Sequence, residues 1–476
     1  MYELQEIEVQ LAVLGGGPAG YVAAIRGAQL GATVALIEER EIGGTCLNRG
    51  CIPTKALLRS SEVAGLIRRS KEFGIVAEIK GTDWATALAR KDRVVKNLRM
   101  GLEHLISQNR IQLVRGHGVV ENKNRIVVKG GAAETAVSCN KLIIATGSEP
   151  LLPDLPGIGL PGVITSDDAL ELPEIPESVL IIGAGAVGLE FATIFNKFGS
   201  AVTVVELENR ILPREDPEVA GELLKIMKRK GIRFWLGARV REISQGEGGL
   251  TVTIEADGTK TLTVDKVLVA VGRKLNTSDD LLTLGLQMEK GRIVVNERME
   301  TSIDGVYAAG DVVGGKLLAH LAFAEGRVAA QNALGNLSSL DYDTVPSCVY
   351  TDPEVASVGL SEEEAKRRGI EVAVGRFYFR SNGRAQCLGE REGLVKVVVD
   401  RREKTVLGAQ ILGANAAELI SELTLAVTLK AKADLLADMI HPHPTLSEAV
   451  MEACGDALGR SIHGVRPGGV AAEGHK

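Results

Sequence analysis

The fold is decided by Gly15-Gly16-Gly17-Pro18-Ala19-Gly20, which follows a mostly apolar, strand-like run over residues 8–14. A helical stretch (21–30) and a second strand (33–37) come next, and this strand ends at Glu38. Strand, glycine turn, helix, strand and acid in this order predict a dinucleotide-binding βαβ unit. In such a unit the first glycine makes the turn, the second lets the backbone approach a pyrophosphate, and the third allows close helix–strand packing, while the acid binds a ribose diol.

The same unit recurs further along the chain at Gly183-Ala184-Gly185-Ala186-Val187-Gly188. A strand (179–182) precedes these glycines, and a helix (189–198) and a strand (202–205) that ends at Glu206 follow them. Two complete fingerprints predict two bound dinucleotides, one held permanently and one exchanged. Because Glu206 would repel a 2′-phosphate, the second site favours NAD over NADP.

Later segments complete this organisation. Each fingerprint has a matching apolar strand that runs into a glycine, at residues 141–147 and 267–272, and we expect Gly147 and Gly272 to face the nucleotides. Residues 82–108 have helical spacing with mixed charge and predict a solvated helix. From about Val345 alternating strands lead to a long helix over residues 416–432, which indicates a third, α+β unit.

Two of the six cysteines lie close together in Gly43-Gly44-Thr45-Cys46-Leu47-Asn48-Arg49-Gly50-Cys51-Ile52-Pro53-Thr54-Lys55. Positions i and i+5 of an undistorted helix point in different directions, so a bond between them requires a broken helix, which Gly50 and Pro53 permit. Cys51, near a helix start, would have a stabilised thiolate. A zinc site and inert buried thiols are alternatives, but the other four cysteines are scattered without pairs. We favour a redox-active disulfide and expect no metal ion.

A second chemical cluster is His441-Pro442-His443-Pro444-Thr445-Leu446-Ser447-Glu448. Glu448 could orient the imidazole of His443 and raise its basicity, as in a general base, and His443-Pro444 is a candidate cis peptide bond. The spacing alone slightly favours another interpretation, a structural loop whose histidines cap a helix. Lys55 and Glu190, each near a helix start beside a fingerprint, could be surface residues or a charge pair buried against a flavin ring.

Bulk properties narrow the class of protein. A length of 476 residues predicts about three or four folding units. The formal charge of -6 argues against a nucleic-acid partner, which needs a concentrated basic face. No stretch is long and apolar enough to span a bilayer, and the acidic opening, residues 1–8, does not resemble a signal peptide. We therefore expect a cytoplasmic protein, in which a close cysteine pair is catalytic, redox-sensing or metal-binding.

The motif of residues 43–55, together with the stretch His443–Glu448, resembles the pyridine nucleotide-disulfide oxidoreductases, and the resemblance extends over residues 9–459. The form Cys51-Ile52-Pro53-Thr54-Lys55 favours the lipoamide branch. The resemblance implies an α/β fold with two Rossmann-like dinucleotide-binding domains, for FAD and NAD, and a C-terminal α+β dimerisation domain. The implied segments are 1–149 (FAD-binding, first part), 150–272 (NAD-binding), 273–344 (FAD-binding and central, second part) and 345–476 (dimerisation).

The resemblance also implies roles for individual residues. Cys46 would exchange with substrate, Cys51 would contact the flavin, and Glu190 would face Lys55 between the flavin and the nicotinamide. His443, from the other subunit, would be the base, oriented by Glu448. The implied FAD contacts are Gly15, Gly17, Gly20, Glu38, Thr45, Lys55, Gly118, Thr146, Gly147, Asp311 (on the ribityl chain) and Ala319. The implied NAD contacts are Gly183, Gly185, Gly188, Glu206, Val240 and Gly272.

The implied activity is oxidation of protein-bound dihydrolipoamide to lipoamide with NAD⁺ as acceptor, by a homodimer. Its partner would be the lipoyl-carrying protein of a 2-oxo acid dehydrogenase complex or of the glycine cleavage system, with no nucleic acid and no membrane. Reduction of another disulfide or of a quinone, and a binding subunit whose chemistry is incidental, are the alternatives. The role of Arg49 is a hypothesis: its charge would favour a nearby thiolate.

Overall fold

The computed structural model describes residues 5–130 and 134–464. The first four residues of the acidic opening and the Gly- and Ala-rich residues 465–476 therefore lie outside the described residues. The chain divides into two compact units, one of residues 1–205 with 239–341 and the other of residues 206–238 with 342–476. The division into four segments that the resemblance implies stays a prediction.

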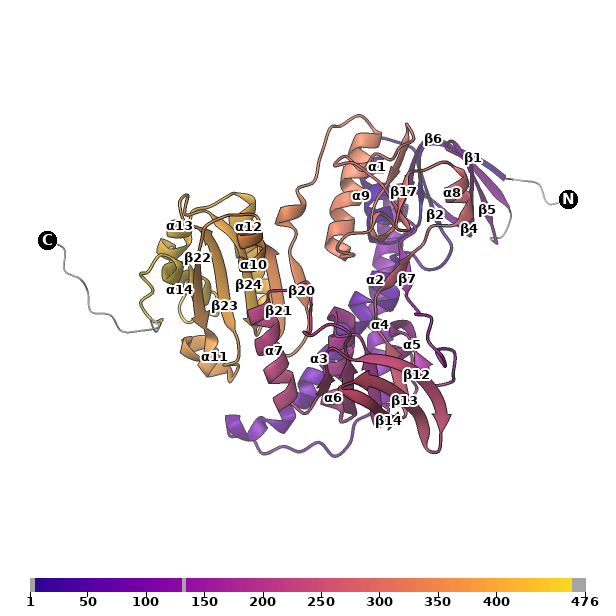
Figure 1. The fold of residues 1–476 in the computed structure, drawn as a ribbon. Coiled ribbons are helices and arrows are strands. Elements are labelled where there is room, and N and C mark those ends of the chain that lie inside the picture. Colours follow the sequence, from indigo (N-terminus) through magenta and orange to yellow (C-terminus); the bar gives the residue numbers. More distant parts are fainter. Residues whose placement is uncertain (1–4, 131–133, 465–476) are drawn as a thin grey trace. The chain divides into compact units, whose positions relative to one another are not determined.

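The first unit begins with the predicted βαβ, formed by β1 (Gln5–Leu14), α1 (Pro18–Gln29) and β2 (Val34–Glu38). β1 pairs in parallel with β2 and with β6 (Thr135–Ile144). Residues 11–13 of β1 are fully buried, as expected of a central strand covered on both faces. α1 packs against α9 (Ala319–Ala333), and Figure 1 shows these two helices beside the sheet. The strand order is β3-β2-β1-β6-β5-β4, with β19 also on β6; the further strands are β3 (Gln112–Arg115), β4 (His117–Asn122), β5 (Arg125–Lys129) and β19 (Val306–Ala308).

The second fingerprint forms the same arrangement within the first unit. β9 (Ser178–Ile182), α6 (Ala186–Phe198) and β10 (Ala201–Val205) follow one another, and β15 (Lys266–Val269) pairs in parallel with β9. Within the first unit the strand order is β10-β9-β15-β8, with β8 at Val163–Ile164. A separate antiparallel sheet contains β12 (Arg239–Gly246), β13 (Gly249–Ala256) and β14 (Gly258–Val264). The two passages of chain between the nucleotide-binding halves pair as β7 (Ser148–Pro150) and β16 (Arg273–Leu275).

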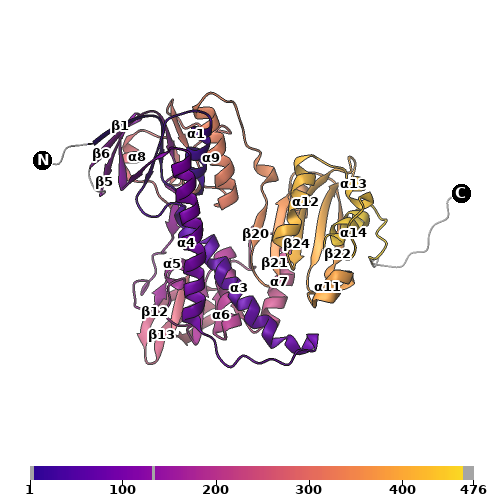
Figure 2. The ribbon, with the colours of Figure 1, turned by 180° about the vertical axis from the view of Figure 1, so that it is seen from behind.

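Two long helices of the first unit, α3 (Cys51–Arg68) and α4 (Trp84–Gln108), pack against each other, as Figure 2 shows. α4 matches the predicted helix and begins after Asp83, whose side chain accepts a hydrogen bond from the Thr86 N–H. The prediction that this helix is solvated is wrong at Lys91. The Lys91 side chain is 2% exposed and donates to the Leu170 carbonyl oxygen and to Glu171, at 2.8 and 2.7 Å. A paired ammonium can be buried in this way.

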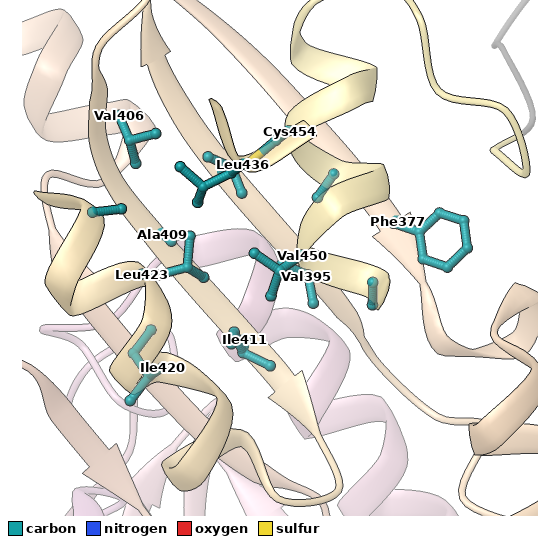
Figure 3. Packing of buried hydrophobic residues seen from close by; sticks show 14 of the residues in the cluster. Phe377, Val395, Val406, Ala409, Ile411, Ile420, Leu423, Leu436, Val450 and Cys454 are labelled. Atoms are coloured by element: carbon teal, nitrogen blue, oxygen red, sulfur yellow. The ribbon is translucent and has the colours of Figure 1, made fainter. Parts of the chain in front are cut away.

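The second unit is built on an antiparallel sheet of order β20-β21-β24-β23-β22. Its strands are β20 (Ser347–Val349), β21 (Glu354–Gly359), β22 (Val372–Tyr378), β23 (Leu394–Asp400) and β24 (Val406–Gly413). Side chains of β23 and β24, such as Val395 and Ile411, pack against the helices α12 (Ala416–Thr428), α13 (Ala433–Asp438) and α14 (Glu448–Ala457) (Figure 3). The predicted α+β unit is therefore present.

The single helix expected over residues 416–432 ends earlier than predicted. α12 ends at Thr428, and Lys430 has φ +50°. The Val406 N–H then donates to the Ala431 carbonyl oxygen at 2.9 Å, and Thr405 and Lys432 form a β-bridge. This pairing with the start of β24 satisfies backbone groups that a continuous helix would have bonded internally.

Apart from α7, which has 13 residues, the remaining elements are short. None of the helices within residues 5–130 and 134–464 combines the length and the apolarity that a membrane crossing needs. The remaining helices are α2 (Gly44–Arg49), α5 (Ser166–Ala169), α7 (Pro217–Arg229), α8 (Asp279–Thr283), α10 (Glu362–Arg367) and α11 (Gly383–Leu388), and the remaining strands are β11 (Arg233–Trp235), β17 (Met288–Glu289) and β18 (Arg292–Ile293).

Candidate active site and dinucleotide sites

The first glycine turn has the geometry that a pyrophosphate site requires. The carboxylate of Glu38 accepts hydrogen bonds from the N–H groups of Gly16 and Arg40, at 2.6 and 2.7 Å. A Cβ on Gly20 would lie 1.7 Å from the Gly15 carbonyl oxygen, so only glycine fits there. α1 starts after Gly17 without a side-chain cap, which leaves N–H groups of its first turn for an anionic ligand. These residues fit the diphosphate and ribose of FAD.

The second glycine turn repeats this geometry. A Cβ on Gly188 would lie 2.1 Å from the Gly183 carbonyl oxygen, and α6 starts after Gly185 without a side-chain cap. Open space surrounds the Cα of Gly272, since nothing lies within 4 Å of a Cβ built there. Glu206, which directly follows β10, accepts a hydrogen bond from the Glu208 N–H at 2.8 Å. The two turns therefore have the same form, as the repeated spacing predicts, and this one fits a second dinucleotide.

The two cysteines lie at a break between helices. α2 ends at Arg49, Gly50 adopts φ -140° and ψ -109°, and α3 begins at Cys51. A Cβ on Gly50 would lie 3.0 Å from the Thr45 carbonyl oxygen. The broken helix that a bond between Cys46 and Cys51 requires is thus present. Both cysteines are free in this structure.

The two thiols differ in acidity. A hydrogen bond between them raises the pKa of Cys46, and burial and the charge of Cys51 raise it further. The same hydrogen bond lowers the pKa of Cys51 to about 7; burial opposes this shift, while the ammonium of Lys55 supports it and Glu190 opposes it. Cys51 is therefore the thiolate of the pair, and Cys46 keeps its proton.

Lys55 and Glu190 form the charge pair that the sequence left open. The Lys55 Nζ lies 2.8 and 3.0 Å from the two carboxylate oxygens of Glu190. Glu190, on α6, is only 5% exposed, which rules out a surface residue. Lys55, one turn after Cys51 on α3, is partly exposed. The pair connects the helix that carries the thiolate to the helix of the second fingerprint.

Arg49 does not have the role that we expected. Its guanidinium lies 2.7 Å from Glu41 Oε2 and 3.8 Å from Asp167 Oδ2. Burial raises the pKa of Glu41, but the hydrogen bond and the charge of Arg49 outweigh this effect and lower it. The positive charge is therefore balanced by two carboxylates, and we assign Arg49 to holding the segment 41–50 against α5.

Asp311 takes part in a hydrogen-bond chain that the sequence analysis missed. Arg273 Nε donates to Ser148 Oγ at 2.6 Å, and Ser148 Oγ donates to Asp311 Oδ2 at 2.5 Å. Because arginine only donates, the hydroxyl proton must point to Asp311, whose other oxygen can bind a sugar hydroxyl. The one signal in the sequence is that Ser148 and Arg273 directly follow the glycines that end the two matching strands.

The other residues expected near FAD or NAD are all in the first unit. Thr146 Oγ1 donates to the Asn276 carbonyl oxygen at 2.7 Å. Gly118 packs closely, since a Cβ there would lie 2.6 Å from Leu14 Cδ1. Thr45 lies in α2, Ala319 opens α9 and Val240 is buried in β12. Their contacts with cofactors remain predictions.

His443 belongs to the second unit and pairs with Glu448 as predicted. His443 Nδ1 lies 2.8 Å from Glu448 Oε1, and the Thr445 N–H donates to Glu448 Oε2 at 2.8 Å. Burial raises the pKa of Glu448, but these two hydrogen bonds outweigh it and lower the pKa. With Nδ1–H bound to a carboxylate, Nε2 is the basic nitrogen of an imidazole whose side chain is 77% exposed.

The alternative interpretation of this loop, histidines that cap a helix, holds for His441, whose Nδ1 lies 3.0 Å from the carbonyl oxygen of Met439 at the C-terminal end of α13, but not for His443. α14 starts after Ser447 without a side-chain cap. The His443-Pro444 peptide bond is cis, as the sequence suggested. For zinc, no group of three or more His, Cys, Asp or Glu residues in the described part of the chain is arranged to hold a metal ion.

Comparison with known proteins agrees with this geometry. A family model described as pyridine nucleotide-disulphide oxidoreductase matches residues 9–326, and the dimerisation domain of the same family matches residues 345–454. Dihydrolipoyl dehydrogenase of Bacillus subtilis is 41% identical over 96% of this chain and 99% of the relative, and that of Thermus scotoductus is 45% identical over 95% and 98%. Among solved structures, the HOCl-induced flavoprotein disulfide reductase RclA from Escherichia coli has a TM-score of 0.83 at 31% identity, covering 94% of this chain and 99% of that one.

Proposed function

The chain belongs to the pyridine nucleotide-disulphide oxidoreductases, and we propose that it oxidises protein-bound dihydrolipoamide to lipoamide with NAD⁺ as acceptor. The observation that carries the proposal is the pair Cys46 and Cys51 at a helix break beside the Lys55–Glu190 ion pair, surroundings that lower the pKa of Cys51 to about 7 and raise that of Cys46. Two fingerprints of the same geometry support one site for FAD and one for NAD. Relatives named dihydrolipoyl dehydrogenase match nearly the whole chain.

The protein's residues perform the thiol–disulfide exchange. Starting from a Cys46–Cys51 disulfide, His443 removes a proton from one substrate thiol, and the resulting thiolate attacks the Cys46 sulfur. The S–S bond breaks and Cys51 leaves as a thiolate, for which its pKa of about 7 suits it. The second substrate thiol, once deprotonated, attacks the substrate sulfur of the mixed disulfide. Lipoamide is released, Cys46 takes up a proton, and two electrons remain on the cysteine pair.

The cofactors would be held by the residues described above. Gly15, Gly17 and Glu38 would bind the diphosphate and ribose of FAD, and Asp311 its ribityl chain. Gly183, Gly185 and Glu206 would bind NAD, and the carboxylate of Glu206 disfavours the 2′-phosphate of NADP. When bound, FAD supplies the two-electron transfer from the dithiol and the hydride transfer to NAD⁺.

The active unit would be a homodimer, because the match of residues 345–454 to a dimerisation domain supports self-association. A second copy of the chain would then supply His443 to the cysteine pair. The substrate carrier would be the lipoyl-bearing protein of a 2-oxo acid dehydrogenase complex or of the glycine cleavage system. A cytoplasmic location stays a prediction from the sequence.

A second candidate function is reduction of another disulfide, which the likeness to a flavoprotein disulfide reductase favours. An anaerobic absorbance titration of the FAD-loaded protein separates the two. We expect dihydrolipoamide to produce a long-wavelength thiolate-to-flavin band that NAD⁺ then removes. If dihydrolipoamide leaves the spectrum unchanged while NADH bleaches the flavin, the lipoamide proposal fails and another disulfide or a quinone is the substrate.

A further inference from the structure

The histidine stretch contains a second imidazole, that of His441, which the proposed reaction does not use. Its side chain is 2% exposed, whereas that of His443 is 77% exposed. His441 Nδ1 lies 3.0 Å from the Met439 carbonyl oxygen, and His441 Nε2 lies 3.0 Å from Glu422 Oε1 on α12. Both ring nitrogens are therefore occupied, one by the loop backbone and the other by a helix.

The partners of His441 determine where its protons are. A carbonyl oxygen only accepts, so Nδ1 carries a proton. Nε2 then either donates to an ionised Glu422 or accepts from a protonated one. In both cases Nε2 is engaged by Glu422, so that no ring nitrogen is left for a substrate. His441 is thus not a second base, and its geometry is that of a brace between α12 and the loop 439–445.

The loop is held at both ends, with His443 in the middle. At the start of the loop, the two ring nitrogens of His441 contact the Met439 carbonyl oxygen and Glu422. At the other end, the Thr445 N–H donates to Glu448, and the Thr445 carbonyl oxygen accepts from Asn382 Nδ2 at 3.0 Å. The charge of His441 also lowers the pKa of Glu448, although this effect is smaller than those of burial and of the hydrogen bonds from Thr445 and His443. The brace and the His443–Glu448 pair are therefore parts of one arrangement.

We propose that His441, held by Glu422, is a positioning residue for the base His443. The proposal rests on the proposed function, in which His443 deprotonates dihydrolipoamide. Without the brace, the segment before the cis peptide bond keeps its covalent connection but loses both anchors to α12 and to the Met439 carbonyl. His443 then samples orientations in which Nε2 misses the substrate thiol. Misplacement by about 1 Å typically costs up to about 100-fold in rate.

The test separates the half-reaction that needs His443 from the one that does not. Rapid-mixing absorbance of FAD-loaded protein measures reduction by dihydrolipoamide and, separately, reduction by NADH. We expect His441→Ala to slow reduction by dihydrolipoamide about 10- to 100-fold and to leave reduction by NADH within about 2-fold of the parent. A general loss of structure would slow both half-reactions, so a defect in only one of them indicates a specific role.

Two further variants sharpen the comparison. Glu422→Gln keeps a neutral partner that can donate to Nε2, so we expect reduction by dihydrolipoamide within about 3-fold of the parent, whereas Glu422→Ala should resemble His441→Ala. His463→Ala is the matched control. His463 Nδ1 also pairs with a buried glutamate, lying 2.6 Å from Glu452 Oε1, but it is outside the loop that carries the base. Both half-reactions should be unchanged in this control.

His443→Gln serves as the reference. If it slows reduction by dihydrolipoamide while His441→Ala and Glu422→Ala do not, the positioning role is overturned and the proposed function stands. If His443→Gln itself reacts at the parental rates, His443 is not the base, and the positioning role of His441 fails with that assignment. The inference would also be overturned if His441→Ala slowed both half-reactions equally. Where His441→Ala does not fold, Glu422→Ala takes its place in this comparison.

Discussion

The acidity of Cys51 can be changed in opposite directions by two substitutions at one ion pair. The pKa of Cys51 is about 7 against 9.0 for an ordinary thiol, which corresponds to about 3 kcal/mol in favour of the thiolate. At pH 7 about half of Cys51 is therefore thiolate, against about 1% for an ordinary cysteine. The hydrogen bond from Cys46 is the largest cause, burial opposes it, and Lys55 is the principal charge that supports it.

Lys55→Gln removes that charge and leaves the carboxylate of Glu190 without its ammonium partner. Since Glu190 raises the pKa of Cys51, the two effects add. The hydrogen bond from Cys46 remains, so we expect the pKa of Cys51 to move part of the way back to 9.0. The thiolate fraction at pH 7 should fall from about half to about a tenth or less.

Glu190→Gln is the matched variant with the opposite sign, because it removes the negative charge and keeps Lys55. The assay is the long-wavelength thiolate-to-flavin absorbance of the two-electron-reduced protein, titrated from about pH 6 to 10. The midpoint should lie at higher pH in Lys55→Gln and at lower pH in Glu190→Gln than in the parent. Midpoints that shift in the same direction, or that stay where they are, would refute this account of Cys51.

Three more predictions follow from close contacts and buried charges. Gly20→Ala should prevent FAD retention, whereas Gly188→Ala should retain FAD but lose NADH-dependent reduction of the flavin, because each Cβ would lie about 2 Å from a carbonyl oxygen of its own turn. Flavin absorbance after desalting measures FAD retention, and rapid mixing with NADH measures flavin reduction. Loss of FAD from both variants would contradict the separation of the two sites. Lys396→Met should destabilise the second unit by about 3–5 kcal/mol in denaturant unfolding, because the side chain of Lys396 is only 3% exposed and its ammonium is 2.9 Å from Asp216, whose side chain is 1% exposed. A loss of unfolding free energy below about 1 kcal/mol would show that Asp216 does not need this partner. Arg49→Ala should leave the titration of Cys51 unchanged and lower stability by about 1 kcal/mol, because the partners of Arg49 are Glu41 and Asp167. A shifted midpoint of the thiolate titration would restore the hypothesis that the charge of Arg49 favours the thiolate.

Where the sequence analysis was wrong, interactions between distant segments overrode local patterns. The helical periodicity of residues 416–432 is real, but the Ala431 carbonyl oxygen bonds to Val406 and the helix ends at Thr428. Lys91 lies in a helix of mixed charge, which is typical of a solvated surface, yet the Leu170 carbonyl oxygen and Glu171 bury it. In both cases the deciding partner is remote in sequence, and no local pattern reports it.

The sequence by itself determined the two dinucleotide folds and the break between Cys46 and Cys51, whereas the pairing of His443 with Glu448 was favoured only by the resemblance to a family. These features depend on residues only a few positions apart, where glycine conformation, helix geometry and side-chain reach leave few arrangements. The position of Cys51 near a helix start already pointed to it as the thiolate, and only the tertiary structure brought Glu190, 135 positions away, to Lys55 beside it. It also brought Ser148 to Asp311 and His441 to Glu422, because such contacts exist only once the sheets and helices have packed.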